Sequence, residues 1–214
     1  MKEFDYSKTG DRKFYKAFMP VGKALSHILY KIEYYGEENI PTDRGYIVAC
    51  NHITALDPVH CGGKIKGQIH FMGKQELFKS PVSAWFLTHM NTFPVRRGAS
   101  DIKALEYAIK VVSEGGILGI FPEGTRSEDF KPAQPKSGVA LVARVTHADI
   151  LPVSLYTDEN AKFRSKLTVR YGAPIKYEEL GFTEEEEHSQ KKLRAAAQVV
   201  MERICDLWSK GHEK

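Results

Sequence analysis

The chain has 214 residues, of which 42% are hydrophobic and 27% are charged. This composition is typical of one globular domain with a substantial apolar core, and it excludes a long disordered chain. No apolar run approaches the ~18 residues that cross a bilayer, so we expect no membrane-spanning helix. The formal net charge is +4, and we expect no nucleic-acid partner.

The first 31 residues concentrate the positive charge of the chain. They carry seven cations against three anions, a difference equal to the whole formal net charge. At ~100° per residue, the apolar side chains between Phe14 and Leu29 fall on one side of a helix, and most of the cations lie opposite. Such a basic amphipathic helix lies in an anionic membrane interface, or its apolar side packs on its own domain. Pro20 is expected to kink or divide the helix.

From residue 32 onward, short apolar runs alternate with helical patterns, which indicates an α/β fold with a mixed, largely parallel sheet flanked by helices. Strands are expected at residues 32–35, 46–50, 69–72, 117–121, 150–156 and 167–171. One helix, capped by Ser100, is expected to run through 104–112 and to stop at Gly115 and Gly116. A second is expected over 138–147, and a last one from a capping box at Thr183. We therefore divide the chain into an amphipathic segment, 1–31, and an α/β domain, 32–214.

The cysteines and the first ten residues bear on location. Cys50, Cys61 and Cys205 form no C-x-x-C pair, and the sequence M-K-E-F-D-Y-S-K-T-G lacks the apolar stretch of a signal peptide. A reducing, intracellular location is the resulting expectation.

The first candidate site is N-H-I-T-A-L-D-P, residues 51–58, directly after an expected strand. His52 and Asp57 are five residues apart, about 140° around an ideal helix, so only a turn can bring their side chains together. Pro58 favours such a turn. Asp57 then either caps the helix that begins at Pro58, or binds one imidazole nitrogen of His52 and leaves the other as a base. The pattern leaves both alternatives open.

A metal site is a rival explanation for the same segment, because His52, Asp57, His60 and Cys61 are close in sequence. Their spacing matches no common zinc pattern, so we expect no metal ligands and no other cofactor. The G-G-K at 62–64 lacks the flanking residues of a P-loop, which gives nucleotide hydrolysis little support.

The second candidate site is F-P-E-G-T-R-S, residues 121–127, which begins at the end of another expected strand. Its guanidinium fork, hydroxyl groups and flexible glycine suit a phosphate group. An ordinary turn with an ion pair between Glu123 and Arg126 is the structural alternative. A third cluster places Arg96 and Arg97 side by side, which by itself is typical of a solvated surface.

Taken together, four blocks resemble the 1-acylglycerol-3-phosphate acyltransferase family in order and spacing. They are N-H-x-x-x-x-D at 51–57, F-P-V-R-R-G at 93–98, F-P-E-G-T-R-S at 121–127 and L-P-V at 151–153. The resemblance implies that His52 is the general base and Asp57 its orienting partner. It also assigns the phosphate of the acceptor to Arg97, Glu123, Gly124, Thr125 and Arg126. Thr54 stands where many members have serine, and Arg96 where many have aspartate.

The function implied by the resemblance is transfer of a fatty acyl group from acyl-CoA or acyl-carrier protein to the sn-2 hydroxyl of 1-acyl-sn-glycerol-3-phosphate, giving phosphatidic acid. The alternatives are another acceptor (glycerol-3-phosphate or another lysophospholipid), a thioesterase-like hydrolase, and a lipid-binding protein without activity. Because such acceptors reside in a bilayer, the resemblance favours a peripheral protein on the cytoplasmic face of an anionic membrane, attached through residues 1–31.

Overall fold

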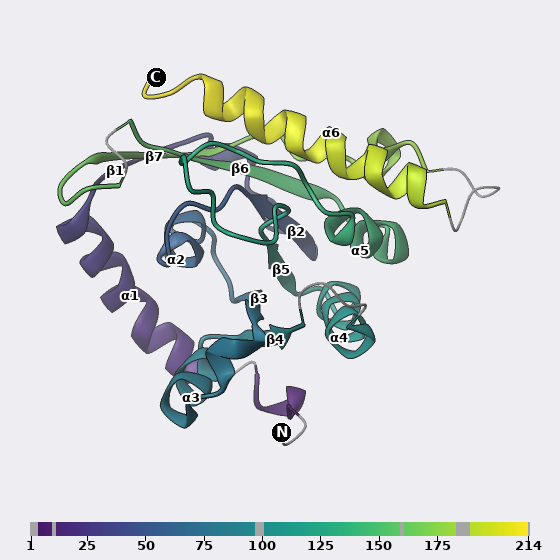
Figure 1. The fold of residues 1–214 in the computed structure, drawn as a ribbon, viewed down its shortest axis with the longest axis horizontal. Helices are drawn as coiled ribbons and strands as arrows, with labels where there is room; N and C mark the ends of the chain where they lie inside the picture. Colours follow the sequence, from purple (N-terminus) through teal and green to yellow (C-terminus); the bar gives the residue numbers. More distant parts are fainter. Residues whose placement is uncertain (1–3, 10–11, 97–100, 159–160, 183–188, 214) are drawn as a thin grey trace.

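A single seven-stranded sheet forms the centre of the computed structural model, which describes residues 4–9, 12–96, 101–158, 161–182 and 189–213 (Figure 1). The strand order is β1-β7-β6-β2-β5-β3-β4. Their bounds are β1 Lys31–Tyr35, β2 Tyr46–Cys50, β3 Ile69–Lys74, β4 Thr92–Val95, β5 Ile117–Ile120, β6 Ile150–Tyr156 and β7 Lys166–Tyr171. Strands β6, β2, β5, β3 and β4 are parallel, whereas β7 pairs antiparallel with β6 and parallel with β1. The predicted mixed, largely parallel sheet is confirmed.

Helices cover both faces of the sheet. The α-helices are α1 Arg12–Leu29, α2 Asp57–Cys61, α3 Pro81–His89, α4 Ile102–Ser113, α5 Gly138–Thr146 and α6 Gln190–Ser209. The short 3-10 helices are η1 Tyr6–Lys8, η2 Glu37–Asn39, η3 Gln75–Phe78 and η4 Tyr177–Leu180. Alternate side chains of β2 point to opposite faces, as expected for a strand. Ile47 packs with α4, α5 and α6, whereas Val48 packs on the other side with Cys61 of α2. Figure 1 shows α1 on this second side.

Strand β4 was not predicted. It has only four residues and contains Pro94, which lacks a backbone N–H and is therefore tolerated mainly at a sheet edge. The strand occupies that position, next to β3 at one end of the sheet.

Pro20 was predicted to kink or divide the amino-terminal helix, and a division is wrong, because the helix is continuous through Pro20. Tyr15, Met19 and Ser26 form its buried side. Gly22 of α1 faces Val59 of α2, and a Cβ atom built at Gly22 would lie at van der Waals distance, 3.4 Å, from that side chain. At the carboxyl end of α1, the carbonyl of Leu29 accepts a hydrogen bond from the backbone N–H of Arg164.

The starts of two helices differ from the prediction. The N-cap of α4 is Asp101, whose carboxylate accepts a hydrogen bond from Ala104 N at 3.4 Å, whereas the predicted cap, Ser100, lies outside the described residues. Helix α6 begins at Gln190 with Ser189 as its cap. The predicted capping box at Thr183 lies outside the described residues.

Candidate active site

The side chains of His52 and Asp57 meet just beyond the carboxyl end of β2. His52 Nδ1 lies 2.7 Å from Asp57 Oδ2. Asp57 is completely buried, and the side chain of His52 is 14% exposed. No hydrogen bond to the second imidazole nitrogen, Nε2, is found among the described residues. The pair therefore presents one imidazole nitrogen toward solvent and holds the other on a carboxylate.

The turn between the two residues is closed by the carboxylate of Asp57. Its Oδ2 accepts hydrogen bonds from Ile53 N at 2.5 Å and Thr54 N at 2.8 Å, and its Oδ1 accepts one from Thr54 Oγ1 at 2.6 Å. Asp57 is the first residue of α2, and Leu56 occupies the N-cap position without a side-chain hydrogen bond. The alternative in which Asp57 caps the helix is therefore wrong, because its carboxylate binds the preceding loop.

Asp57 is held in its charged form. Burial alone would raise the pKa of Asp57, but the hydrogen bonds from His52 and Thr54, together with the nearby imidazole of His60, outweigh it and hold the pKa below its usual value. His60 is fully buried, and its Nδ1 lies 3.5 Å from Asp57 Oδ1. Among the described residues, no three His, Cys, Asp or Glu side chains are arranged to hold a metal ion.

Two aromatic rings support the imidazole of His52 from one face. Phe121 stacks on it with ring centroids 4.0 Å apart and an interplanar angle of 15°. Phe71 in turn stacks on Phe121, at 5.6 Å. Gly119 makes room for this column, since a Cβ atom there would lie 2.2 Å from the ring of Phe71. The orientation of His52 is thus fixed by a hydrogen bond at its edge and a ring at its face.

The loop at 121–127 is attached to His52 through the main chain. Glu123 Oε1 accepts a hydrogen bond from His52 N at 3.2 Å, and Ser127 N donates one to His52 O at 2.8 Å. Burial raises the pKa of Glu123 to about 7, although hydrogen bonds from the backbone of His52 and Ala133 oppose the shift. The described part of the chain contains no ion pair between Glu123 and Arg126. The carboxyl group of Glu123 thus fastens the two candidate loops together.

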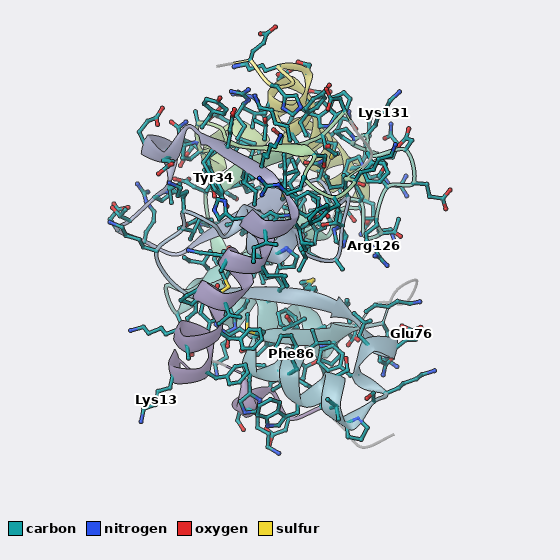
Figure 2. The ribbon with its side chains drawn as sticks, turned by 90° about the vertical axis from the view of Figure 1, so that its left-hand side faces the viewer. Lys13, Tyr34, Glu76, Phe86, Arg126 and Lys131 are labelled. Carbon is teal, nitrogen blue, oxygen red and sulfur yellow. The ribbon has the colours of Figure 1, made fainter. Side chains whose placement is uncertain are left out.

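A lysine that the sequence analysis missed lies over this loop. Gly124 has a φ of 71°, and a Cβ atom on it would lie 3.0 Å from Lys136 Cδ, Cε and Nζ. Lys136 N also donates to Pro122 O at 2.8 Å. Thr125 and Arg126 are exposed, and Figure 2 shows Arg126 on the same side of the molecule as Lys131. The one hint of Lys136 in the sequence is its position as a basic residue just before the helix predicted at 138–147.

Several known proteins resemble this chain in amino-acid sequence. A family model described as Acyltransferase matches residues 31–156. The 1-acyl-sn-glycerol-3-phosphate acyltransferase of Bacillus subtilis is 30% identical over 183 residues, which are 84% of this chain and 89% of that protein. The chain belongs to the 1-acylglycerol-3-phosphate acyltransferase family. The enzyme of the same name from Streptococcus pneumoniae is 31% identical to this acyltransferase over 78% of the chain and 64% of its own length.

A solved structure agrees with the fold of this acyltransferase. The crystal structure of the 1-acyl-sn-glycerophosphate acyltransferase PlsC from Thermotoga maritima has a TM-score of 0.70 and 28% sequence identity. The matched region covers 90% of this chain and 77% of the solved chain. Within the described residues, no helix of the acyltransferase is long and apolar enough to cross a membrane.

Asn51, the first residue of the N-H-x-x-x-x-D block, connects two strands of the acyltransferase. Asn51 is fully buried, and its side chain makes two hydrogen bonds to one residue of β6. Asn51 Oδ1 accepts from Leu155 N at 2.7 Å, and Asn51 Nδ2 donates to Leu155 O at 2.9 Å. This amide therefore ties the start of the His52 loop to the neighbouring strand.

The two adjacent arginines of the acyltransferase follow β4, whose carboxyl end lies at the same edge of the sheet as those of β2 and β5. Arg96 N donates to Asp101 Oδ2 at 3.0 Å, and Arg96 Nε lies 3.5 Å from the same oxygen. Arg96 is thus bound to the first turn of α4. Arg97 lies outside the described residues, and its contact with the acceptor phosphate stays a prediction.

Proposed function

We propose that this protein transfers a fatty acyl group from acyl-CoA or acyl-carrier protein to the sn-2 hydroxyl of 1-acyl-sn-glycerol-3-phosphate, giving phosphatidic acid. The observation that carries the proposal is the contact of 2.7 Å between His52 Nδ1 and the buried carboxylate of Asp57. The acceptor is inferred from the names of the relatives in Bacillus subtilis and Streptococcus pneumoniae.

The proposed reaction begins at His52. The ionised carboxylate of Asp57 accepts a hydrogen bond from the N–H at Nδ1, which fixes the tautomer and leaves Nε2 as the base. Nε2 removes the proton of the acceptor hydroxyl while its oxygen attacks the thioester carbonyl. The tetrahedral intermediate then expels the thiolate, which is protonated by His52 with the proton that came from the acceptor hydroxyl. No covalent acyl-enzyme and no cofactor take part in this scheme.

The acceptor phosphate is proposed to bind at the loop of residues 121–127. Arg126 offers a planar fork of donors, and it has no ion-pair partner among the described residues. Lys136 adds a second cation beside Gly124, where the absence of a side chain allows close approach. In this scheme Thr125 and Arg97 contact the phosphate, whereas buried Glu123 holds the loop against His52.

An acceptor panel tests the proposal. The purified protein is incubated with acyl-CoA or with acyl-carrier protein, and with 1-acyl-sn-glycerol-3-phosphate, glycerol-3-phosphate or lysophosphatidylcholine. Release of thiol that depends on the first acceptor supports the proposal, and comparison of the donors identifies the natural one. Thiol release without any acceptor would indicate a hydrolase, and lipid binding without thiol release would indicate a binding protein.

We also propose that α1 attaches the catalytic domain, 32–214, to the cytoplasmic face of an anionic membrane as a peripheral protein. One side of α1 is buried, but Val21, Leu25 and Ile28 are 56%, 45% and 59% exposed. Val82 and Trp85 of α3 are also exposed, at 78% and 54%. Apolar side chains that stay exposed along one side of a helix suit an interfacial position.

The two helices form one surface. The ring of Phe14 on α1 lies 5.2 Å from that of Trp85 on α3, and Phe18 lies 4.9 Å from Phe86. Figure 2 looks onto α1, with Lys13 near its amino end and Phe86 beside it. The docking face, defined as Val21, Leu25, Ile28, Val82 and Trp85, therefore comes from two helices that pack on each other.

A further inference from the structure

An open pocket lies at the opposite edge of the sheet from His52. It has a volume of about 790 Å³ and is bordered by α1 and by the residues where β2, β3 and β5 begin, among them Tyr46 and Ile117. Tyr46 and His52 are six residues apart, and a strand rises ~3.3 Å per residue, so the pocket lies on the order of 20 Å from the candidate base. We call it the amino-edge pocket.

Positive charge dominates the lining of the amino-edge pocket. Four cations line it, Lys16 and Lys23 of α1 together with Arg44 and Lys66, against the single carboxylate of Asp43. Arg44 is partly neutralised, since it lies 3.4 Å from Asp43 and 3.5 Å from Asp149. Lys16, Lys23 and Lys66 have no ion-pair partner in the described ranges. The pocket therefore gathers cations whose charge the protein itself does not balance.

The pKa values of Lys23 and His70 are both lowered in this pocket. Partial burial, and then the charge of Lys64, lower the pKa of Lys23. His70 also borders the pocket, but burial lowers its pKa to about 4, so it is neutral at pH 7. A bound anion would favour the charged form of Lys23.

Two buried donors in the lining lack partners. The hydroxyl group of Tyr46 and the amide nitrogen of Gln68 are inaccessible to solvent and make no hydrogen bond to any described residue. Tyr46 is only 1% exposed. Buried polar groups are nearly always paired in folded proteins, so such groups beside a cavity indicate a missing acceptor. Positive charge and unpaired donors call for the same ligand, an anion with several acceptor oxygens.

We propose that the amino-edge pocket binds a phosphate compound that carries at least two negative charges, at a site separate from the catalytic loops. The ligand bridges Lys16 and Lys23 on α1 to Lys66 and Arg44 on the loops before the strands, with Tyr46 and Gln68 donating to its oxygens. Its binding therefore holds α1 against the edge of the sheet.

Soluble phosphate esters and lipid headgroups share this chemistry, but the geometry favours a soluble compound. Lys23 and Leu25 are two residues apart, about 160° around the helix, so the pocket and the docking face lie on opposite sides of α1. A lipid whose tails are in the membrane beneath the docking face would therefore have its headgroup on the wrong side of the helix.

Binding of pyrophosphate to the full chain, measured by isothermal titration calorimetry, tests the proposal. We expect one saturable site, with affinity reduced at least about tenfold in Lys23→Gln and in Lys66→Gln, since each loses a charged hydrogen bond. Tyr46→Phe should also weaken binding without lowering the melting temperature, because the lost hydroxyl has no partner in the protein. Lys191→Gln and Arg194→Gln, on the exposed side of α6, are matched charge controls and should bind normally.

Three outcomes would overturn the proposal. One is no saturable binding at millimolar pyrophosphate. The second is binding lost in Arg126→Ala and retained in the Lys23 and Lys66 variants, which would place the anion at the catalytic loops. The third is equal binding in Tyr46→Phe, Lys23→Gln and wild type. Displacement of pyrophosphate by phosphatidylglycerol vesicles, but not by phosphatidylcholine vesicles, would overturn the assignment to a soluble compound. These assays measure binding alone, so their result is independent of the proposed acyl transfer.

Discussion

The backbone N–H of His52 donates a hydrogen bond to the buried carboxyl group of Glu123, over 3.2 Å. The two loops that follow β2 and β5 are therefore joined at the residue proposed as the base. The position of His52 therefore depends on both loops. The same hydrogen bond links the proposed base to the loop that is proposed to bind the phosphate.

Replacing the proposed base should remove the activity and leave the fold intact. We expect His52→Ala to lower kcat by ~10²–10⁴-fold, the usual contribution of acid-base catalysis. The exposed His27 supplies a control, since His27→Ala should leave kcat unchanged. Steady-state kinetics and circular dichroism would measure both effects. Substantial activity in a folded His52→Ala protein would contradict the mechanism.

The carboxylate of Asp57 has two roles that substitutions can separate. Asp57→Asn should lower kcat by up to ~10⁴-fold, because an amide no longer fixes the tautomer of His52. It should also lower the melting temperature, because the charge that binds the loop at 53–54 is lost. Thr54→Val removes one of the hydrogen bonds to Asp57 and the one that Thr54 Oγ1 accepts from Leu56 N, but it keeps the carboxylate, so its activity should fall less than about tenfold. An Asp57→Asn protein with near-normal kcat would exclude Asp57 as the orienting partner.

The carboxyl group of Glu123 should make stability fall as pH rises. Its folded pKa, about 7, lies above the value of 4.5 that applies in the unfolded chain. Protons therefore bind more tightly to the folded state, and the advantage present below pH 4.5 is lost as pH rises through 7. Glu123→Gln keeps an acceptor for His52 N but cannot ionise. Its melting temperature should exceed that of the wild type by a few degrees at pH 8 and match it near pH 5. An equal difference at both pH values would show that Glu123 does not titrate in this range.

The arginines at the proposed phosphate site should affect the acceptor more than the donor. We expect Arg126→Ala and Arg97→Ala to raise KM for 1-acyl-sn-glycerol-3-phosphate by about tenfold or more, with KM for the acyl donor nearly unchanged. Arg126→Lys should restore only part of the affinity, because an ammonium group lacks the planar fork. Lys136→Ala should act in the same direction. Equal use of an acceptor without phosphate by the wild type would contradict this assignment.

The docking face should be required for membrane binding but not for folding. Serine at Val21, Leu25 and Ile28 together should abolish co-sedimentation with anionic vesicles and leave the melting temperature unchanged, because these side chains are exposed. Serine at Phe14 and Phe18 should lower the melting temperature, since both rings pack on α3.

Salt and a distant surface provide controls for the vesicle experiment. Binding of the wild type should weaken as salt rises, because screening reduces the attraction of the cations to the membrane. Serine at Ile102 and Val145, which are exposed away from α1, should leave binding unchanged. A wild type that ignores vesicles of any charge would return α1 to a purely packing role.

Much of the sheet could be predicted because its central strands are continuous apolar runs, as in Tyr46–Cys50. Strand β4 was missed because Pro94 argues against a strand unless its edge position is known. The sequence left open whether Pro20 kinks α1 or divides it, and the helix is not divided. Tyr15 and Met19, which precede Pro20, are buried against the domain, and no local pattern of the sequence indicates that packing.

The candidate site was predictable in its residues but not in its geometry. The motifs identified His52 and Asp57, but the choice between cap and partner depends on the direction of one carboxylate, which the turn sets. Lys136 reaches Gly124 through the folding of the loop between them, and no periodicity of the sequence indicates such a contact.

The paired hydrogen bonds of Asn51 explain how the main chain leaves the sheet at this point. β2 stops pairing with β6 at Cys50, opposite Val153, so two residues later Leu155 has a strand partner on its β7 side, Val169, but none on its β2 side. The side-chain amide of Asn51 takes the place of a backbone peptide group and continues the hydrogen bonding to β6 for one more residue. The backbone can therefore turn out of the plane of the sheet immediately, so that His52 projects beyond the edge while the residue before it stays hydrogen-bonded to β6.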